Sequence, residues 1–484
     1  MKLLALHGSK IALLTVVVAA TACNEGPPVA PTKVVAPASQ MAAAPRYIVE
    51  LIGAGSVPPS VASLVQSHGG RILGFHAGTG LVVVGGISRE AAIEVAMAPG
   101  VRAVAPDLTM RMIRDPTMRL FSGRLVADSK VLTAVGARGN PRTAQFYSHQ
   151  WNMTRIHADS AWQVSTQGAG VKVFILDTGI DTAHVDLAGL VDTKHSTSFA
   201  YAPTDTLFQN PLPFSHDVVG HGSFVSSIIA SNSLGIAAVA PQAKLTMVRV
   251  LDDSGMGSSV GLLQGILYAT DSGANIINMS LGGYLGRKGG SDLAFADIYQ
   301  RVIDYATQRG VLLVAAAGNE SVNTNTGTSP SGSYADSMDT PAGLHHVLSV
   351  GATGPVDQVN FDQIAKYSNF GKAGVGVFAP GGNTVDQTTT GQADLVLGVC
   401  SSAMPLCPGT EIQYLIGAGT SFSSPHVAGE AAVVRGQRGA TMTVTNLENC
   451  ILQSADNVSK HRPDVNYNFG RIDVLSGLVN SHCK

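Results

Sequence analysis

The last two-thirds of this 484-residue chain predicts an α/β fold, a doubly wound and mostly parallel sheet. Two observations predict it: short apolar runs recur along the segment, and stretches with helical periodicity stand between them. Such alternation indicates parallel strands joined by helices on both faces of the sheet. A third observation, the order β-α-β-β-α-β between residues 46 and 113, predicts a small ferredoxin-like α+β domain in front of it.

The elements of the small domain are recognised from apolar runs and from one helix cap. Ser88 stands before a segment of helical periodicity and has the side chain of an N-cap. The short apolar runs around that segment predict strands. We expect strands at 46–52, 71–76, 80–87 and 101–110, and helices at 61–68 and 88–98.

The large domain is expected to span residues 150–484. The run that ends at Leu176 predicts a buried parallel strand, because it is apolar on both faces. Phe224, Val225 and Ile228 recur at the spacing of one helix face. We expect strands at 171–176, 244–251, 274–281, 310–317, 346–352 and 374–380, and helices at 221–231, 257–272, 292–308 and from Ser424 onward.

Composition describes a well-buried globular protein, with 45% apolar and 13% charged residues. The formal net charge is −2, and no run of Lys or Arg occurs anywhere. Nucleic-acid partners need a basic patch or stripe, so the charge pattern argues against nucleic acid as a partner.

Residues 1–22 have the pattern of a signal peptide, with lysines, an apolar core and small residues up to Ala22. This predicts export to an extracellular or periplasmic location. Cys23 follows the cleavage site directly, so two alternatives stay open: simple secretion, or a lipid anchor on Cys23 that holds the protein at a membrane. Residues 23–45 are rich in Pro and Ala and predict an extended tether.

The chain has five cysteines, an odd number for an exported protein. Setting Cys23 aside leaves Cys400, Cys407, Cys450 and Cys483. Proximity in the sequence favours disulfide bonds from Cys400 to Cys407 and from Cys450 to Cys483. Three pairings are open in principle, and free buried thiols are the alternative.

Four polar residues stand at the ends of predicted elements. Asp177 and Asn319 each follow a strand, His221 begins a helix, and Ser421 precedes one. Taken singly, each has a structural explanation as a turn residue, a loop histidine or a helix cap. Carboxyl ends of strands gather at one edge of an open α/β sheet, where sites are found. We therefore expect the four side chains to come together.

These four residue types form a complete set for acyl transfer. A serine hydroxyl is a weak nucleophile and needs a base, and the base needs a third group that fixes its tautomer. We assign Ser421 as nucleophile, His221 as base and Asp177 as the supporting carboxylate. The amide of Asn319 supplies a donor for the oxyanion, with the N–H groups at the helix N-terminus beside Ser421.

The segments resemble those of the subtilisin family of serine proteases, in the order Asp, His, Asn, Ser, which separates the chain from chymotrypsin-like and α/β-hydrolase enzymes. The resemblance runs from about Gln150 to residues 468–474 and is most specific over 419–429, GTSFSSPHVAG. It implies a secreted serine endopeptidase that hydrolyses peptide bonds through an acyl-enzyme, with no cofactor for catalysis.

The resemblance also implies a binding site for extended polypeptides. Ser280, Leu281 and Gly282 match the strand that pairs with the substrate, and Ala317 and Gly318 match the other wall of the pocket for the side chain before the scissile bond. Because strand addition uses main-chain hydrogen bonds, it implies broad specificity.

Two acids near that pocket have two interpretations. Glu320 and Asp339 either line it and favour Lys or Arg, or are solvated loop acids; the second interpretation is favoured.

By the same resemblance the small domain, residues 46–113, is an inhibitory pro-domain that assists folding and blocks the site with its C-terminal strand. The precursor would then be a zymogen that cuts itself between about Arg111 and Gln145. Residues 114–149 are expected to form an irregular linker, because they lack a clear core pattern. An accessory domain unrelated to inhibition is the alternative.

A structural calcium ion is a further implication of the resemblance. Asp186, Asn232 and the carbonyl groups of Leu234 and Ile236 match the calcium ligands of the family. Two matched side chains fall short of a full coordination shell, and an Asx turn at Asn232 is the alternative.

Two rival functions are kept open. GSSVG, residues 257–261, matches the nucleophile elbow of lipases and would make Ser259 the nucleophile, but a loop-like sequence precedes it where the elbow requires a strand. The other rival is an inactive protein that binds peptides in a degenerate protease site; no catalytic group is missing to support it.

Overall fold

The computed structural model describes residues 46–53, 55–113, 115–121, 138–205, 208–287, 290–383, 390–407, 412–439, 441–457, 468–480 and 483. All of them belong to one compact unit. The predicted signal peptide, Cys23 and the tether of residues 23–45 lie outside the described residues.

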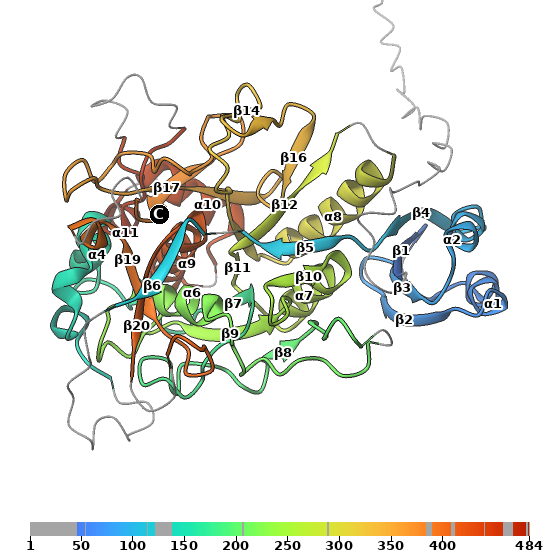
Figure 1. The fold of residues 1–484 in the computed structure, drawn as a ribbon, viewed down its shortest axis with the longest axis horizontal. Coiled ribbons are helices and arrows are strands. Elements are labelled where there is room, and N and C mark those ends of the chain that lie inside the picture. The colour runs from blue at the N-terminus through green and yellow to red at the C-terminus, as the bar shows by residue number, and fades with distance from the viewer. Residues whose placement is uncertain are drawn as a thin grey trace, which may run out of the picture. The chain divides into compact units, whose positions relative to one another are not determined.

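The small domain has the predicted order of elements (Figure 1). They are β1 (Arg46–Leu51), α1 (Pro59–Ser67), β2 (Arg71–His76), β3 (Leu81–Gly85), α2 (Arg89–Ala96) and β4 (Val101–Pro106). The sheet has the order β2-β3-β1-β4 with antiparallel pairs, so the ferredoxin-like prediction is confirmed. The Ser88 hydroxyl accepts a hydrogen bond of 3.2 Å from the amide of Ala91, as expected of an N-cap.

Seven parallel strands form the main sheet of the large domain, in the order β18-β17-β13-β11-β7-β9-β8. Their bounds are β7 (Lys172–Asp177), β8 (Thr197–Ser198), β9 (Lys244–Arg249), β11 (Ile276–Met279), β13 (Leu312–Ala316), β17 (Val347–Thr353) and β18 (Val377–Pro380). The predicted parallel α/β fold is therefore confirmed.

Helices cover both faces of this sheet. Val173 and Ile175 of β7 join one apolar core, with Phe224 of a helix, whereas the alternate residues Phe174 and Leu176 join the other. A strand buried on both sides needs this run without polar alternation. The helices are α4 (Trp151–Arg155), α5 (Ala158–Ala161), α6 (His221–Ile229), α7 (Ser259–Asp271), α8 (Gly290–Gln308), α9 (Thr420–Arg438), α10 (Val444–Ser454) and α11 (Val474–Val479).

The run 274–281, expected as one strand, forms parts of two. It breaks at Ser280 between β11 and β12 (Leu281–Gly286). β12 leaves the main sheet and joins a second one, in the order β10-β5-β12-β16, with β10 (Met256–Ser258), β5 (Thr109–Met112) and β16 (Ser337–Thr340). A third sheet contains β19 (Val396–Val399), β20 (Tyr414–Ala418) and β6 (Thr117–Leu120), and β14 (Thr328–Ser329) pairs with β15 (Gly332–Ser333).

The predicted irregular linker is partly wrong. β5 and β6 pair with two different sheets of the large domain, and β6 lies inside the stretch expected to be irregular. We call residues 109–113 and 115–120 the crossing segment. Strands of four residues carry too little periodicity to be predicted, and here the edges of β12 and β20 supply the hydrogen bonds that define them.

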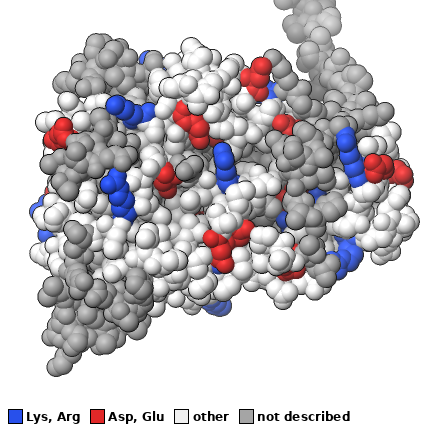
Figure 2. All heavy atoms as spheres, viewed as in Figure 1, with Lys and Arg blue, Asp and Glu red and all other residues white. Residues whose placement is uncertain are grey.

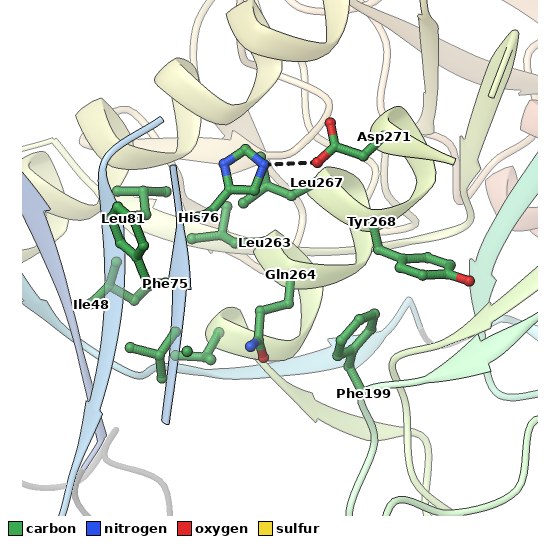
Figure 3. A pocket seen from close by; sticks show the side chains of 13 residues that line it. Ile48, Phe75, His76, Leu81, Phe199, Leu263, Gln264, Leu267, Tyr268 and Asp271 are labelled. Carbon is green, nitrogen blue, oxygen red and sulfur yellow. Dashed lines mark hydrogen bonds and ion pairs between the residues drawn. The ribbon is translucent and has the colours of Figure 1, made fainter. Parts of the chain in front are cut away.

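Polar contacts join the small and large domains. Asp107, just after β4, accepts hydrogen bonds from the hydroxyl of Ser259 at 2.9 Å and from the amide of Val260 at 3.0 Å, at the start of α7. The His76 ring lies 3.0 Å from the carboxylate of Asp271 at the other end of α7. Between these contacts an apolar cavity of about 280 Å³ separates β2 and β3 from α7 (Figure 3).

The disulfide bonds favoured by proximity are both present, Cys400 with Cys407 and Cys450 with Cys483. On the face drawn in Figure 2, basic and acidic side chains are interspersed and do not gather by sign. No helix within the described ranges has both the length and the apolar character needed to cross a membrane.

Candidate active site

The carboxyl end of β7 and the first residue of α6 bring a carboxylate and an imidazole together. Oδ1 of Asp177 lies 2.7 Å from Nδ1 of His221, and both side chains are fully buried. The same oxygen accepts a hydrogen bond of 2.7 Å from the amide of Thr178. This contact fixes the imidazole so that Nε2 points away from Asp177, as a general base requires.

Ser421 lies in the first turn of α9 rather than before the helix, and Pro425, expected in the first turn, lies further inside. Proline has no N–H to donate to the carbonyl oxygen four residues back. That oxygen, on Ser421, accepts a hydrogen bond of 2.8 Å from the hydroxyl of Ser280 instead. The hydroxyl of Ser421 is buried and has no hydrogen-bond partner among the described residues. The ring of Phe422 next to it lies 5.9 Å from the His221 ring, centroid to centroid.

Asn319 is held in one orientation by the residue before Ser421. Its Oδ1 accepts hydrogen bonds from the amide of Thr420 at 2.9 Å and from the hydroxyl of Thr420 at 2.8 Å. The Nδ2 group therefore faces the other way, toward the site, as an oxyanion donor must. Nothing in the sequence alone singled out Thr420 for this positioning role.

The strand predicted to bind substrate is occupied by the chain itself. Met112 of β5 stands opposite Leu281, and Arg111 stands opposite Gly282, in antiparallel register. On the other side of β5, Arg111 stands opposite Met256 of β10. The crossing segment thus lies as a strand between two strands of the large domain.

Ser280 is predicted to bind substrate together with Leu281 and Gly282, but its side chain points into the protein. Its hydroxyl meets Ser424 at 2.9 Å and accepts a hydrogen bond of 3.0 Å from Asn278.

The predicted opposite wall, Ala317 and Gly318, is fixed by Asn369. The carbonyl oxygen of Ala317 accepts a hydrogen bond of 2.6 Å from the Asn369 amide. Gly318 has φ +100°, and a Cβ atom there would collide with Asn369 and crowd Glu320. Only glycine suits this position, because both the backbone and the neighbours exclude a side chain.

The two acids near the pocket are both half-buried. Glu320 accepts a hydrogen bond of 2.8 Å from the hydroxyl of Tyr284. Asp339 lies on β16, and a Cβ atom on Gly282 would be 3.5 Å from its Oδ1 and 3.5 Å from Cδ1 of Ile113. Burial, and then the negative charge of Glu320, raise the pKa of Asp339 well above its ordinary value. The favoured interpretation of the sequence thus fails for Asp339, which lies on a strand, whereas Glu320 does lie in a loop.

Asp115 is a second residue at the site, besides Thr420, that the sequence did not indicate. Its Oδ2 lies 3.3 Å from Nε2 of His221, and its Oδ1 accepts a hydrogen bond of 3.3 Å from Nδ2 of Asn319. Burial opposes the charged imidazole, but the carboxylates of Asp177 and Asp115 outweigh it and raise the pKa of His221 well above 6.5. The sequence around Asp115 lies in a predicted linker and gives no sign of this contact. Asp115 is brought here by the pairing of β5 with β12 and of β6 with β20.

The residues matched to a calcium site form a hydrogen-bonded loop and do not fit a metal cage. The Asp186 carboxylate accepts hydrogen bonds from the amides of Leu234, Gly235 and Ile236 and from the Tyr414 hydroxyl. Amide N–H groups point at the carboxylate where a cation would stand.

The remaining matched groups are only partly engaged. The Nδ2 group of Asn232 donates to two carbonyl groups, whereas its Oδ1 is buried with no hydrogen-bond partner among the described residues. The carbonyl groups of Leu234 and Ile236 accept from Gln145 and Ser231. Within the described residues no group of three or more His, Cys, Asp and Glu could hold a metal ion.

Ser259, the rival nucleophile, is buried at the first position of α7. Its hydroxyl donates to Asp107 and accepts a hydrogen bond of 2.8 Å from the amide of Leu108. Among the described residues no histidine contacts this hydroxyl, so Ser259 does not form the elbow of a lipase.

A parallel sheet that presents a carboxylate-supported imidazole beside a serine in the first turn of a helix is the arrangement of a serine hydrolase. The sequence model of the Subtilase family matches residues 168–471, more than half of the chain. The chain therefore belongs to the subtilase family and is a serine endopeptidase.

Two curated relatives agree with this assignment. The chain is 31% identical over 346 residues to the thermophilic serine proteinase of Bacillus sp. (strain AK1), covering 71% of this chain and 70% of the relative. It is 32% identical over 322 residues to thermitase of Thermoactinomyces vulgaris, covering 66% and 92%.

Among solved structures, the epidermin leader peptide processing serine protease of Staphylococcus aureus has a TM-score of 0.69 at 21% identity, covering 90% of this chain and 97% of that one. At this identity the likeness shows the shared fold alone.

Proposed function

We propose that this subtilase is an exported zymogen that cuts its own crossing segment and becomes a broad-specificity endopeptidase. The observation that supports the proposal most is the place of the crossing segment. Met112 and Arg111 pair with Leu281 and Gly282, and Asp115 beyond them meets His221 and Asn319. A peptide substrate would be recognised in the same way, through main-chain hydrogen bonds that demand little of its sequence.

In the proposed mechanism, the hydroxyl oxygen of Ser421 attacks the peptide carbonyl carbon while Nε2 of His221 takes its proton. Asp177 holds the imidazolium through Nδ1. The negative charge on the tetrahedral intermediate accepts hydrogen bonds from Nδ2 of Asn319 and the amide of Ser421. His221 then gives its proton to the leaving amine, the C–N bond breaks, and water hydrolyses the acyl-enzyme with His221 again as base.

The proposed maturation cut falls on one of the two peptide bonds between Ile113 and Asp115. β5 ends at Met112 and β6 begins at Thr117, and Asp115 between them lies against His221. The small domain would then be the inhibitory pro-domain. A lipid on Cys23 would anchor only the released piece. N-terminal sequencing of the active material gives both the bond and the fate of the N-terminal segment.

Two variants test the catalytic proposal. Ser421→Ala should remain folded and lose about a million-fold in turnover of casein or a peptide anilide, and Asn319→Ala should lose roughly a hundred- to thousand-fold. These magnitudes are those of subtilisin itself, a member of this family. A fluorophosphonate should label the wild type and not S421A. Wild-type turnover in S421A would refute the assignment, and failure of the wild type to label would favour an inactive peptide-binding protein.

A further inference from the structure

The carboxylate of Asp115 is placed from both sides of the chain. β5 before it is paired with β12, and β6 after it is paired with β20, where Thr117 stands opposite Ala418. The Asp115 side chain is 5% exposed, so solvent does not screen it effectively. Strand pairing on both sides therefore holds this one charge against the catalytic groups.

Gly419 makes room for this carboxylate. A Cβ atom on Gly419 would collide with Oδ1 of Asp115 and would lie 3.3 Å from Nδ2 of Asn319. The φ angle of Gly419 is 167°, which is extended backbone that any residue can adopt. A side chain at position 419 is therefore excluded by Asp115 and not by the backbone conformation. The Asp115 carboxylate fills the space next to Nδ2 of Asn319.

The groups around Asp115 are those that would stabilise a negatively charged oxygen. Nδ2 of Asn319 is the proposed oxyanion donor, and the imidazole of His221 faces the other carboxylate oxygen. A fixed negative charge at this place competes with the oxyanion for the same donor. It also favours the charged imidazole, which cannot accept a proton from Ser421.

We propose that Asp115 is an internal inhibitor of the precursor, whose carboxylate occupies the oxyanion site and keeps the crossing segment uncut until that carboxylate leaves. This inference rests on the proposed function. It concerns a side chain rather than the covering of the site by a pro-domain, and it predicts that removal of one carboxylate from the cut segment makes self-cleavage faster.

The test compares self-cleavage of full-length precursors. Wild type, Asp115→Ala, Asp115→Asn and Arg119→Gln are refolded from denaturant, and the loss of intact chain is followed by gel electrophoresis and mass spectrometry. Arg119 is the matched control, because it lies on β6 and its side chain contacts Thr117 instead of the catalytic groups. We expect D115A to cleave at least about tenfold faster than wild type, D115N to lie between them, and R119Q to match wild type.

Two further measurements separate the possible failures. Melting of each substitution in the S421A background shows whether the variant folds, and D115N keeps the shape of the side chain if D115A does not fold. Precursors that label with a fluorophosphonate but cleave no faster in D115N and D115A overturn the role of Asp115 alone. Wild-type protein that neither labels nor cleaves overturns the proposed function itself.

Discussion

The hydroxyl of Ser280 donates a hydrogen bond of 2.8 Å to the carbonyl oxygen of Ser421. That oxygen lacks its usual helical partner, because Pro425 has no N–H. The end of β11 thus completes the first turn of α9. Ser280 therefore supports the backbone of Ser421, the proposed nucleophile, in addition to standing beside β12, which pairs with β5.

Ser280→Ala should destabilise the protein by about 1–3 kcal/mol, because a buried carbonyl group loses the donor that stands in for the missing N–H of Pro425. Turnover should fall as well, since the turn that carries Ser421 loses its support. Urea unfolding in the S421A background measures the first effect. Ser226→Ala is the matched control: its hydroxyl is buried without a hydrogen-bond partner among the described residues, and its loss should be nearly neutral. Equal effects of the two substitutions would contradict the role of Ser280.

Self-cleavage should become faster as the pH rises through the raised pKa of His221. Below that pKa the imidazole is charged and cannot act as a base. The carboxylates of Asp177 and Asp115 face it. Asp217, further from the ring, accepts hydrogen bonds from the hydroxyl groups of Thr178 and Ser223. In D115N the rise should move to lower pH, because one of the two carboxylates is neutralised.

The same shift has a consequence for stability. Because the folded-state pKa of His221 is raised, its contribution to stability is fully present below the unfolded pKa of about 6.5 and is lost as the pH rises through the folded value. Rates and melting temperatures measured between about pH 6 and pH 9 check both effects. A rate that falls with pH over this range, or the same profile in D115N, would be inconsistent with the mechanism.

Asp339 should make the preference for the residue before the scissile bond depend on pH. The carboxyl group of Asp339 lies beside Gly282 and Ile113. Because its pKa is raised, this group stays neutral up to a higher pH than an ordinary aspartate. Peptides with Lys or Arg at that position should gain kcat/KM relative to those with Ile as the pH rises and Asp339 ionises. Asp339→Asn should remove this dependence, whereas Asp159→Asn, in the exposed pair with Arg142, should keep it. An unchanged profile in D339N would exclude Asp339 from the pocket.

The Asp186 carboxylate already accepts hydrogen bonds from amides and a hydroxyl group. Removal of calcium by a chelator should therefore not lower the melting temperature of the S421A precursor through this loop. Asp186→Ala should destabilise the protein by about 1.5–3 kcal/mol or more, because charge-assisted hydrogen bonds are lost. A large drop in melting temperature with EDTA in S421A, absent from S421A/D186A, would restore the calcium site that the family resemblance implies.

Most of the fold could be predicted from local sequence patterns. The parallel strands and the ferredoxin-like order were predictable because each element has its own period or cap, as with the apolar run of β7 and the N-cap Ser88. The disulfide pairs were predictable from proximity. The helix that carries Ser421 was placed a turn too late, because Pro425 in a sequence argues for a helix start and only the Ser280 contact makes it acceptable further inside.

By itself the sequence determined the family and the class of fold, because these depend on short motifs and on periodicity within single elements; the roles of the four site residues stay a prediction. Tertiary structure alone decided where Asp115, Thr420 and Asp339 stand and that the Asp186 loop is closed by hydrogen bonds. Those positions follow from pairing between strands and loops that are far apart in the chain. Contacts across such pairings do not show as a periodic pattern in the sequence around the residue.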